Sequence, residues 1–200
     1  ITAGMGGGTG TGAAPIVAEI AQEMDKLTVA VVTKPFKFEG PKKMEKAEKG
    51  IASLLEHVDA LIVIPNQNLL SGDQKLTMRQ SYALADEVLK TDVISIAEII
   101  TRHDEINVDF ADITTIIKNA GFAHMAIGHG QGKDKVQDVV SQVISSDLLE
   151  TSITGAKRLL VNITMSEDIV VDEIDELTNA ITAAVDPDAE IIFGNGYNPD

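Results

Sequence analysis

The sequence has no cysteine and no tryptophan, and only 4% of its 200 residues are aromatic. Without cysteine the chain can form neither a disulfide nor a thiolate metal site, which is the usual composition of a protein from the reducing cytosol. It also lacks any apolar run near the ~20 residues that cross a bilayer. Its first residues have neither the basic nor the apolar region of a signal peptide. We therefore expect a cytoplasmic protein that does not insert directly into a membrane.

Positive charge is also scarce, with 16 Lys and Arg against 31 Asp and Glu and a net charge of −15. A surface of this sign repels the phosphates of nucleic acids and of anionic lipids, so nucleic acid is not expected as a partner. A small anion can still bind where backbone N–H groups gather. The histidines lack the spacing of a metal pair on a helix, and no metal ligands are predicted among them; they are His57, His103, His124 and His129.

Apolar and amphipathic segments alternate over the first 70 residues of the chain. This alternation predicts strands and helices in turn, and therefore a parallel α/β sheet. The apolar runs are nearly continuous, as in strands buried on both faces. We expect strands at 1–3, 27–36 and 60–66, and helices from Pro15 to about 25 and at 41–58.

A segment without proline or glycine, residues 77–102, predicts a single helix of roughly 35–40 Å. A short helix follows, with Asp109 as its possible N-cap and Gly121 at its end. The rest of the chain predicts a second α/β domain, with strands at 122–130, 156–166 and 189–194 and helices at 134–146 and 172–185. We expect the long helix to join two domains, residues 1–76 and 103–200.

The densest cluster of glycine is "GMGGGTGTGAAP", which lies between a predicted strand and a predicted helix. Glycine lets backbone N–H groups approach an anion, and a helix N-terminus adds positive partial charge, so this arrangement predicts phosphate binding. A tight turn is the alternative, although one or two glycines would suffice for it. The loop has no lysine, which excludes a P-loop. Gly8 to Ala13 match G-x-G-x-x-A, but the next strand ends in Thr33-Lys34-Pro35 without the acid that holds a dinucleotide ribose.

The run Gly6 to Gly12, "GGGTGTG", resembles the signature of the tubulin superfamily. The segments "TKPFKFEGPKKM", "VIPNQNLL", "INVDFADI" and "RLLVNIT" further resemble the FtsZ family, the bacterial tubulin homologues of cell division, in the same order. The resemblance extends over essentially all 200 residues. It implies a tubulin/FtsZ-like fold, in which a Rossmann-like parallel-sheet GTP-binding domain is joined by a long central helix to a smaller α/β C-terminal domain. Residues 1–76 would be the C-terminal part of the first domain, and 103–200 the catalytic (synergy) loop and a truncated second domain.

The resemblance implies that GTP or GDP binds to the first domain. The glycine run would hold the phosphates, Glu39 would contact the ribose, and Tyr82 would stack near the guanine. Asp86 would pair with the guanine edge, because a carboxylate can accept from the N1–H and N2–H₂ groups that adenine lacks. Lys43 stands where many relatives carry arginine. The implied nucleotide-binding residues are Gly6, Gly7, Gly8, Thr9, Gly10, Thr11, Gly12, Glu39, Lys43, Asn66, Tyr82 and Asp86.

The second chemical element is "NVDFAD", which contains Asn107, Asp109 and Asp112. A capped helix explains one of the two acids. The resemblance implies that this loop enters the GTP site of the next subunit, where Asp109 and Asp112 position the water that attacks the γ-phosphate and Asn107 orients the loop. Mg²⁺ would bind mainly through the phosphates.

The resemblance therefore implies a GTPase that assembles head-to-tail into filaments of the division ring at mid-cell. A tubulin-like structural polymer that binds GTP without efficient hydrolysis is one alternative, although such a polymer has no need of both acids. A dinucleotide-dependent oxidoreductase is another.

The chain opens on what looks like the end of a strand, and we interpret it as a piece of a longer protein. By the resemblance, earlier phosphate-contacting loops, the last strand and a C-terminal tail that recruits membrane-anchor and division proteins lie outside it. We expect this chain alone to fold poorly, to bind GTP weakly and to be inactive.

Overall fold

The computed structural model describes residues 1–70, 76–101, 109–144, 153–166 and 168–197. The chain divides into two compact units. Unit 1 comprises Ile1–Ile96 and Ile117–Met125, and unit 2 comprises Ala97–Ile116 and Ala126–Asp200. Over the described ranges, no helix combines the length and the apolar character needed to cross a bilayer.

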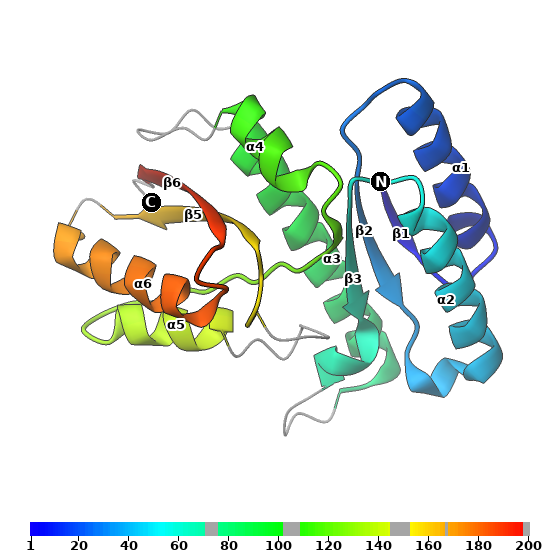
Figure 1. Ribbon diagram of the computed structural model, residues 1–200. Helices are drawn as coiled ribbons and strands as arrows, with labels where there is room; N and C mark the ends of the chain where they lie inside the picture. The colour runs from blue at the N-terminus through cyan, green and yellow to red at the C-terminus, as the bar shows by residue number, and fades with distance from the viewer. Residues whose placement is uncertain (71–75, 102–108, 145–152, 167, 198–200) are drawn as a thin grey trace. The chain divides into compact units, whose positions relative to one another are not determined.

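Unit 1 is built on a parallel sheet whose strands lie in chain order (Figure 1). The central strands β2 and β3 are buried along most of their length, as expected of continuous apolar runs in a sheet covered on both faces. The predicted parallel α/β architecture is therefore confirmed. The strands are β1 (Thr2–Gly4), β2 (Val29–Lys34), β3 (Ala60–Pro65) and β4 (Gly121–Ala123).

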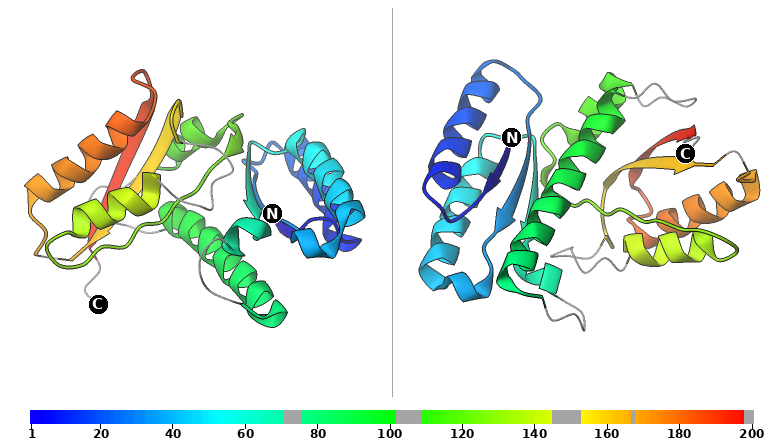
Figure 2. Two further views of the ribbon diagram at one scale, coloured as in Figure 1. Left: turned by 90° about the horizontal axis from the view of Figure 1, so that it is seen from below. Right: turned by 180° about the vertical axis from the view of Figure 1, so that it is seen from behind.

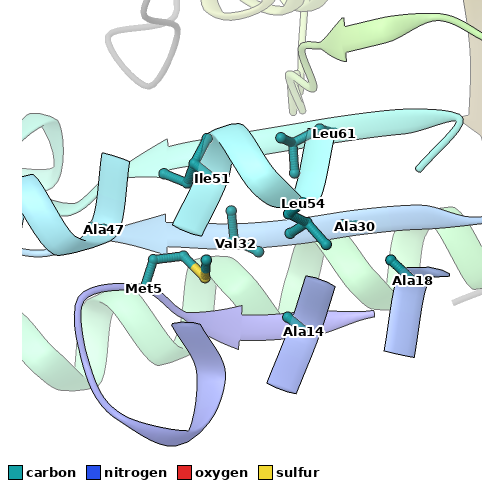
Figure 3. Packing of buried hydrophobic residues seen from close by; sticks show 9 residues of the cluster. All are labelled: Met5, Ala14, Ala18, Ala30, Val32, Ala47, Ile51, Leu54 and Leu61. Atoms are coloured by element: carbon teal, nitrogen blue, oxygen red, sulfur yellow. The ribbon is translucent and has the colours of Figure 1, made fainter. Parts of the chain in front are cut away.

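One face of this sheet is covered by α1 (Thr9–Glu23) and α2 (Pro41–Leu55), which pack against each other. Figure 3 shows the apolar side chains that fill the space between the two helices and the sheet. Small residues on α1 allow that helix to lie close to the strands. The core consists of Met5, Ala14, Ala18, Ala30, Val32, Ala47, Ile51, Leu54 and Leu61.

Residues of β2 and β3 that alternate with this core point to the opposite face, since successive side chains of a strand point to opposite sides. There Val31, Ile62 and Ile64 contact the helix α3 (Met78–Thr101) through its Val88, Leu89 and Ile96. The strand pattern thus accounts for both layers of helices.

The helix α3 has 24 residues, or about 36 Å at 1.5 Å per residue, and matches the predicted long helix to within one residue at each end. Its start is fixed by reciprocal capping between Thr77 and Gln80. The Thr77 N–H donates to Gln80 Oε1 at 2.9 Å, and the Gln80 N–H donates to Thr77 Oγ1 at 3.3 Å.

Unit 2 contains a pair of parallel strands, β5 (Arg158–Met165) and β6 (Glu190–Tyr197). The helices α5 (Lys135–Ile144) and α6 (Val171–Ala184) lie on the same side of this pair (Figure 2). A salt bridge of 2.8 Å between Lys135 Nζ and Glu173 Oε1 joins these two helices. The unit also contains most of α4 (Phe110–Ile117), and from α5 onward its helices and strands alternate as predicted.

The predicted strand 122–130 is wrong in both extent and place. Only Gly121–Ala123 forms a strand, and it extends the sheet of unit 1 beside β3 rather than that of unit 2. Asp59 explains the pairing, because its carbonyl accepts the Gly121 N–H at 3.0 Å and its carboxylate accepts the Asn119 N–H. The domain limits at 76 and 102 remain a prediction.

The first predicted helix also begins earlier than expected, at Thr9 instead of near Pro15. Pro15 is the seventh residue of α1 and lies inside it. Proline keeps a helical φ there, but the hydrogen bond to the carbonyl four residues earlier is lost. The second half of the glycine run is consequently the first turn of a helix.

Candidate functional site

The carboxyl ends of β1, β2 and β3 lie at one edge of the unit 1 sheet, where Gly4 pairs with Thr33 and Lys34 pairs with Pro65. Each strand is followed by a segment with a predicted nucleotide contact. The glycine run follows β1, the turn that carries Glu39 follows β2, and Asn66 follows β3. Parallel α/β sheets place ligands at this edge. The topology therefore places the residues of three separate predictions at one edge of the sheet.

Gly6 shapes the loop that follows β1. Its φ of +96° belongs to the left-handed region, and a Cβ there would lie 2.7 Å from the Lys43 carbonyl oxygen on α2. Its N–H donates to Thr11 Oγ1 at 2.8 Å and closes the loop onto α1. Because this N–H is already bonded, we assign Gly6 to the shape of the loop and not to phosphate contact.

Two other glycines allow close packing behind the loop. A Cβ on Gly10 would lie 2.7 Å from the Gly4 carbonyl oxygen, so glycine lets α1 approach β1. A Cβ on Gly50 of α2 would lie 2.5 Å from Thr11 Cγ2. Gly50 was missed from the sequence, although an isolated glycine within an amphipathic helix is a signal of close packing.

Successive backbone N–H groups at the start of α1 have no acceptor in the part of the chain that the structure describes. Within the described ranges, the N–H groups from Gly7 to Thr11 donate no hydrogen bond, and the first to do so is that of Gly12, which bonds the Gly8 carbonyl at 3.2 Å. Apart from their chain neighbours, no described residue has an atom within 4 Å of the positions where Gly7 and Gly8 would carry a Cβ. Unpaired N–H groups, open space and the positive end of the helix dipole are the features with which a helix N-terminus can bind an anion.

Glu39, at the end of the short helix η1 (Lys37–Glu39), is held by several donors. Its Oε1 accepts the Phe36 N–H at 2.8 Å, its Oε2 accepts a hydrogen bond from Lys43 Nζ, and its side chain is only 9% exposed. Burial opposes ionisation, but hydrogen bonds from Lys43, the Phe36 N–H and Tyr82 outweigh it and hold the pKa of Glu39 below its usual range. The same bond to Glu39 raises the pKa of Lys43. The site thus holds an ionised pair beside the glycine loop.

Three aromatic rings lie next to this pair. Phe36 is fully buried and stacks on Phe38, with 5.0 Å between the ring centroids and an angle of 11°. Tyr82 of α3 meets both rings edge-on, at 5.4 and 6.1 Å. Phe38 and Tyr82 stay 50% and 39% exposed, so they offer an apolar surface to a planar ligand. Phe36 and Phe38 had no predicted role, because their contact depends on the turn at η1.

Asn66 begins the short helix η2 (Asn66–Leu70), directly after β3. Asn66 is 6% exposed, and its Oδ1 has no hydrogen-bond partner among the residues that the structure describes. A buried polar atom without a partner is rare in folded proteins and is explained when a ligand supplies the missing bond. Asp86 is exposed and lies four residues after Tyr82 on the same side of α3.

The predicted acids of the "NVDFAD" loop belong to unit 2, whereas the residues described above belong to unit 1. Asp109 caps α4 as predicted: its Oδ1 accepts the Asp112 N–H at 2.8 Å, and its carbonyl accepts the Ile113 N–H at 3.1 Å. Both carboxylates therefore stand at the N-terminus of α4. Asn107 lies outside the described residues.

Comparison with known proteins agrees with this architecture. The family model of the Tubulin/FtsZ family, GTPase domain, matches residues 1–73, and that of the FtsZ family, C-terminal domain, matches residues 121–200. The cell division protein FtsZ of Caulobacter vibrioides is 48% identical over 201 residues, which cover 100% of this chain and 40% of that protein. The chain belongs to the FtsZ family.

Solved structures show the same fold. The FtsZ of M. jannaschii described as an empty dimer has a TM-score of 0.93 and 40% identity, over 100% of this chain and 58% of that one. CetZ1 from Haloferax volcanii, a GDP-bound monomer, has a TM-score of 0.73 at 19% identity, over 59% of its length, and shares the fold alone. This chain thus spans less than two thirds of its FtsZ relatives. Its parallel-sheet domains have the tubulin/FtsZ fold, which argues against a dinucleotide-dependent oxidoreductase.

Proposed function

We propose that the full-length gene product binds GTP and GDP at the carboxyl edge of the unit 1 sheet. The observation that carries this proposal is the row of unpaired N–H groups from Gly7 to Thr11 at the start of α1. These donors can hold the nucleotide's phosphates, and the open space beside Gly7 and Gly8 allows close approach. Membership of the FtsZ family supports a guanine nucleotide as the ligand.

In this proposal, each of the other predicted residues of unit 1 contacts a different part of the nucleotide. The Glu39 carboxylate accepts a hydrogen bond from a ribose hydroxyl, and Lys43 adds positive charge near the phosphates. Tyr82 stacks near the base, and Asn66 gives its unpaired Oδ1 to the nucleotide. Asp86 accepts from guanine N1–H and N2–H₂, a pair of donors that adenine lacks.

Hydrolysis, in this proposal, is completed by a second copy of the protein. Asp109 and Asp112 of one subunit position and polarise the attacking water at the nucleotide of the next, and Asn107 helps to orient their loop. Mg²⁺ would bind mainly through the phosphates of the nucleotide. When bound, it supplies charge neutralisation at the β- and γ-phosphates.

A contact of this kind is head-to-tail and repeats as an open filament. We propose that these filaments belong to the division ring, in the cytoplasm at mid-cell, in line with the name of the Caulobacter relative. Membrane-anchor and division proteins would bind a C-terminal tail outside this chain. A polymer that binds GTP without efficient hydrolysis is the competing function.

Nucleotide competition tests the guanine assignment. We expect the full-length protein to bind GTP at least tenfold more tightly than ATP and about tenfold more tightly than ITP, which lacks the N2 amino group, because one hydrogen bond to a charged acceptor contributes about 1.5 kcal/mol. Asp86→Ala should bring the GTP and ITP affinities together. Glu87→Ala, at the next exposed position of α3, is the matched control. Equal binding of GTP and ATP by the parent would overturn the proposal.

A further inference from the structure

The turn that carries Glu39 is joined by one side chain to the segment that follows the neighbouring strand. Gln67 of η2 accepts the Lys37 N–H of η1 through its Oε1, at 3.1 Å. The strands before these two segments end side by side, because Lys34 at the end of β2 pairs with Pro65 at the end of β3. Gln67 therefore continues the link between β2 and β3 beyond the end of the sheet.

The start of η1 depends on two side-chain acceptors. The first N–H groups of a helix have no acceptor within the helix itself. Here the Phe36 N–H donates to Glu39 Oε1 at 2.8 Å, and the next N–H, that of Lys37, donates to Gln67. Within the described ranges neither N–H has another acceptor. Glu39 thus closes the turn from within, whereas Gln67 ties it to a different element.

Gln67 comes directly after Asn66, whose buried Oδ1 has no partner among the described residues. Asn66 and Glu39 are both proposed nucleotide contacts, and they follow different strands. The bond between Lys37 and Gln67 restrains the position of one contact relative to the other. Because only the oxygen of an amide can accept from an N–H, the same bond sets which way the Gln67 amide is turned.

We propose that Gln67 is a positioning residue for sugar recognition, which holds η1 against η2 so that the Glu39 carboxylate meets a ribose hydroxyl. This inference rests on the proposed binding of GTP. Without the Gln67 acceptor, the Lys37 N–H loses its partner and η1 is tied to η2 less firmly. Sugar discrimination then falls. Base discrimination stays the same, because Asp86 lies on α3.

The test compares Gln67→Met with the parent full-length protein in competition binding of GTP, 2′-deoxyGTP, 3′-deoxyGTP and ITP. Methionine has nearly the length of glutamine and only a weak acceptor. We expect the parent to prefer GTP over at least one deoxynucleotide by about tenfold, and Gln67→Met to reduce this ratio by about threefold or more. The GTP/ITP ratio should stay the same. Gln131→Met, at an exposed position in unit 2, should change neither ratio.

The conservative variant is Gln67→Glu, because a carboxylate also accepts the Lys37 N–H. Its added negative charge should weaken the binding of GTP and of the deoxynucleotides alike, since all of them carry the same phosphates. The sugar ratio should therefore stay within about twofold of the parent ratio. Unfolding midpoints without nucleotide show whether each variant is folded.

An unchanged sugar ratio in Gln67→Met overturns the inference, and so does an equal loss of affinity for GTP and the deoxynucleotides. A Gln67→Glu variant that loses the ratio as Gln67→Met does would show that the acceptor is not the cause. A parent that binds GTP and both deoxynucleotides equally also overturns the inference. All of these outcomes leave GTP binding intact, whereas a parent that binds no GTP overturns the proposed function as well.

Discussion

The glycines between β1 and α1 have different tasks, although the sequence presents them as one run. Gly6 takes a left-handed conformation against α2, and Gly10 lets α1 approach β1. Gly7 and Gly8 instead face open space. The run as a whole predicted a phosphate site, but the task of each glycine depends on φ and on neighbours from α2 and β1, which the local sequence does not specify.

Replacing Gly8 tests the site at this scale. Gly8 has φ −86° and ψ −58°, which alanine adopts readily, and its Cβ would meet no described residue other than its chain neighbours. Gly8→Ala should therefore fold normally but place a methyl group in the space proposed for phosphate. We expect GTP affinity of the full-length protein to fall at least about tenfold, with an unchanged unfolding midpoint without nucleotide.

The control for this variant is Glu19→Ala, at an exposed position further along α1. It should alter neither quantity. If Gly8→Ala bound GTP as tightly as the parent, the N-terminus of α1 would not be the phosphate site.

At the scale of elements, both ends of α3 were predicted to within one residue, but its buried face contains a residue that the sequence pattern did not predict. Asp92 lies between Leu89 and Ile96 on the side of α3 that faces the sheet, and it is 8% exposed. Within the described residues it has no hydrogen bond or ion pair. Burial raises the pKa of Asp92 from an ordinary 3.8 to about 6. The sequence predicted the helix α3 itself, but it did not predict that α3 buries a carboxylate on the side that faces the sheet.

This carboxylate makes stability depend on pH. Because the pKa is higher in the folded state than in the unfolded chain, the folded state binds more protons between about pH 4 and pH 6, and stability falls as pH rises through that range. Above about pH 6 the penalty is fully present. Asp92→Asn should thus stabilise the full-length protein by about 1–3 kcal/mol at pH 7.5, with a smaller gain at pH 4.5.

Urea unfolding at the two pH values measures this difference. Glu87→Gln, at an exposed position of the same helix, should leave the pH dependence of the parent unchanged. Identical slopes of stability against pH for Asp92→Asn and the parent would show that Asp92 is not the group responsible.

At the scale of the whole molecule, the alternation of strands and helices was enough to predict at which edge of the sheet the candidate site lies. Parallel strands put their carboxyl ends together, so the glycine run, Glu39 and Asn66 had to follow one edge. The place of β4 was not predictable, because a strand of three residues takes its partner from contacts with Asp59 and not from its own pattern. Asp109 and Asp112 fall in the other unit, and their role at the nucleotide of a second copy remains a proposal.

The most direct test of the proposed shared site is phosphate release from GTP by the full-length protein, measured as a function of protein concentration. We expect a threshold with a steep rise in rate above it, because two subunits form each site. Asp112→Ala, mixed with the parent, should lower the rate by more than its share of the subunits, while Asp138→Ala, which changes an acid on α5, should only dilute it. A rate strictly proportional to concentration, with no excess inhibition by Asp112→Ala, would contradict a catalytic site shared between subunits.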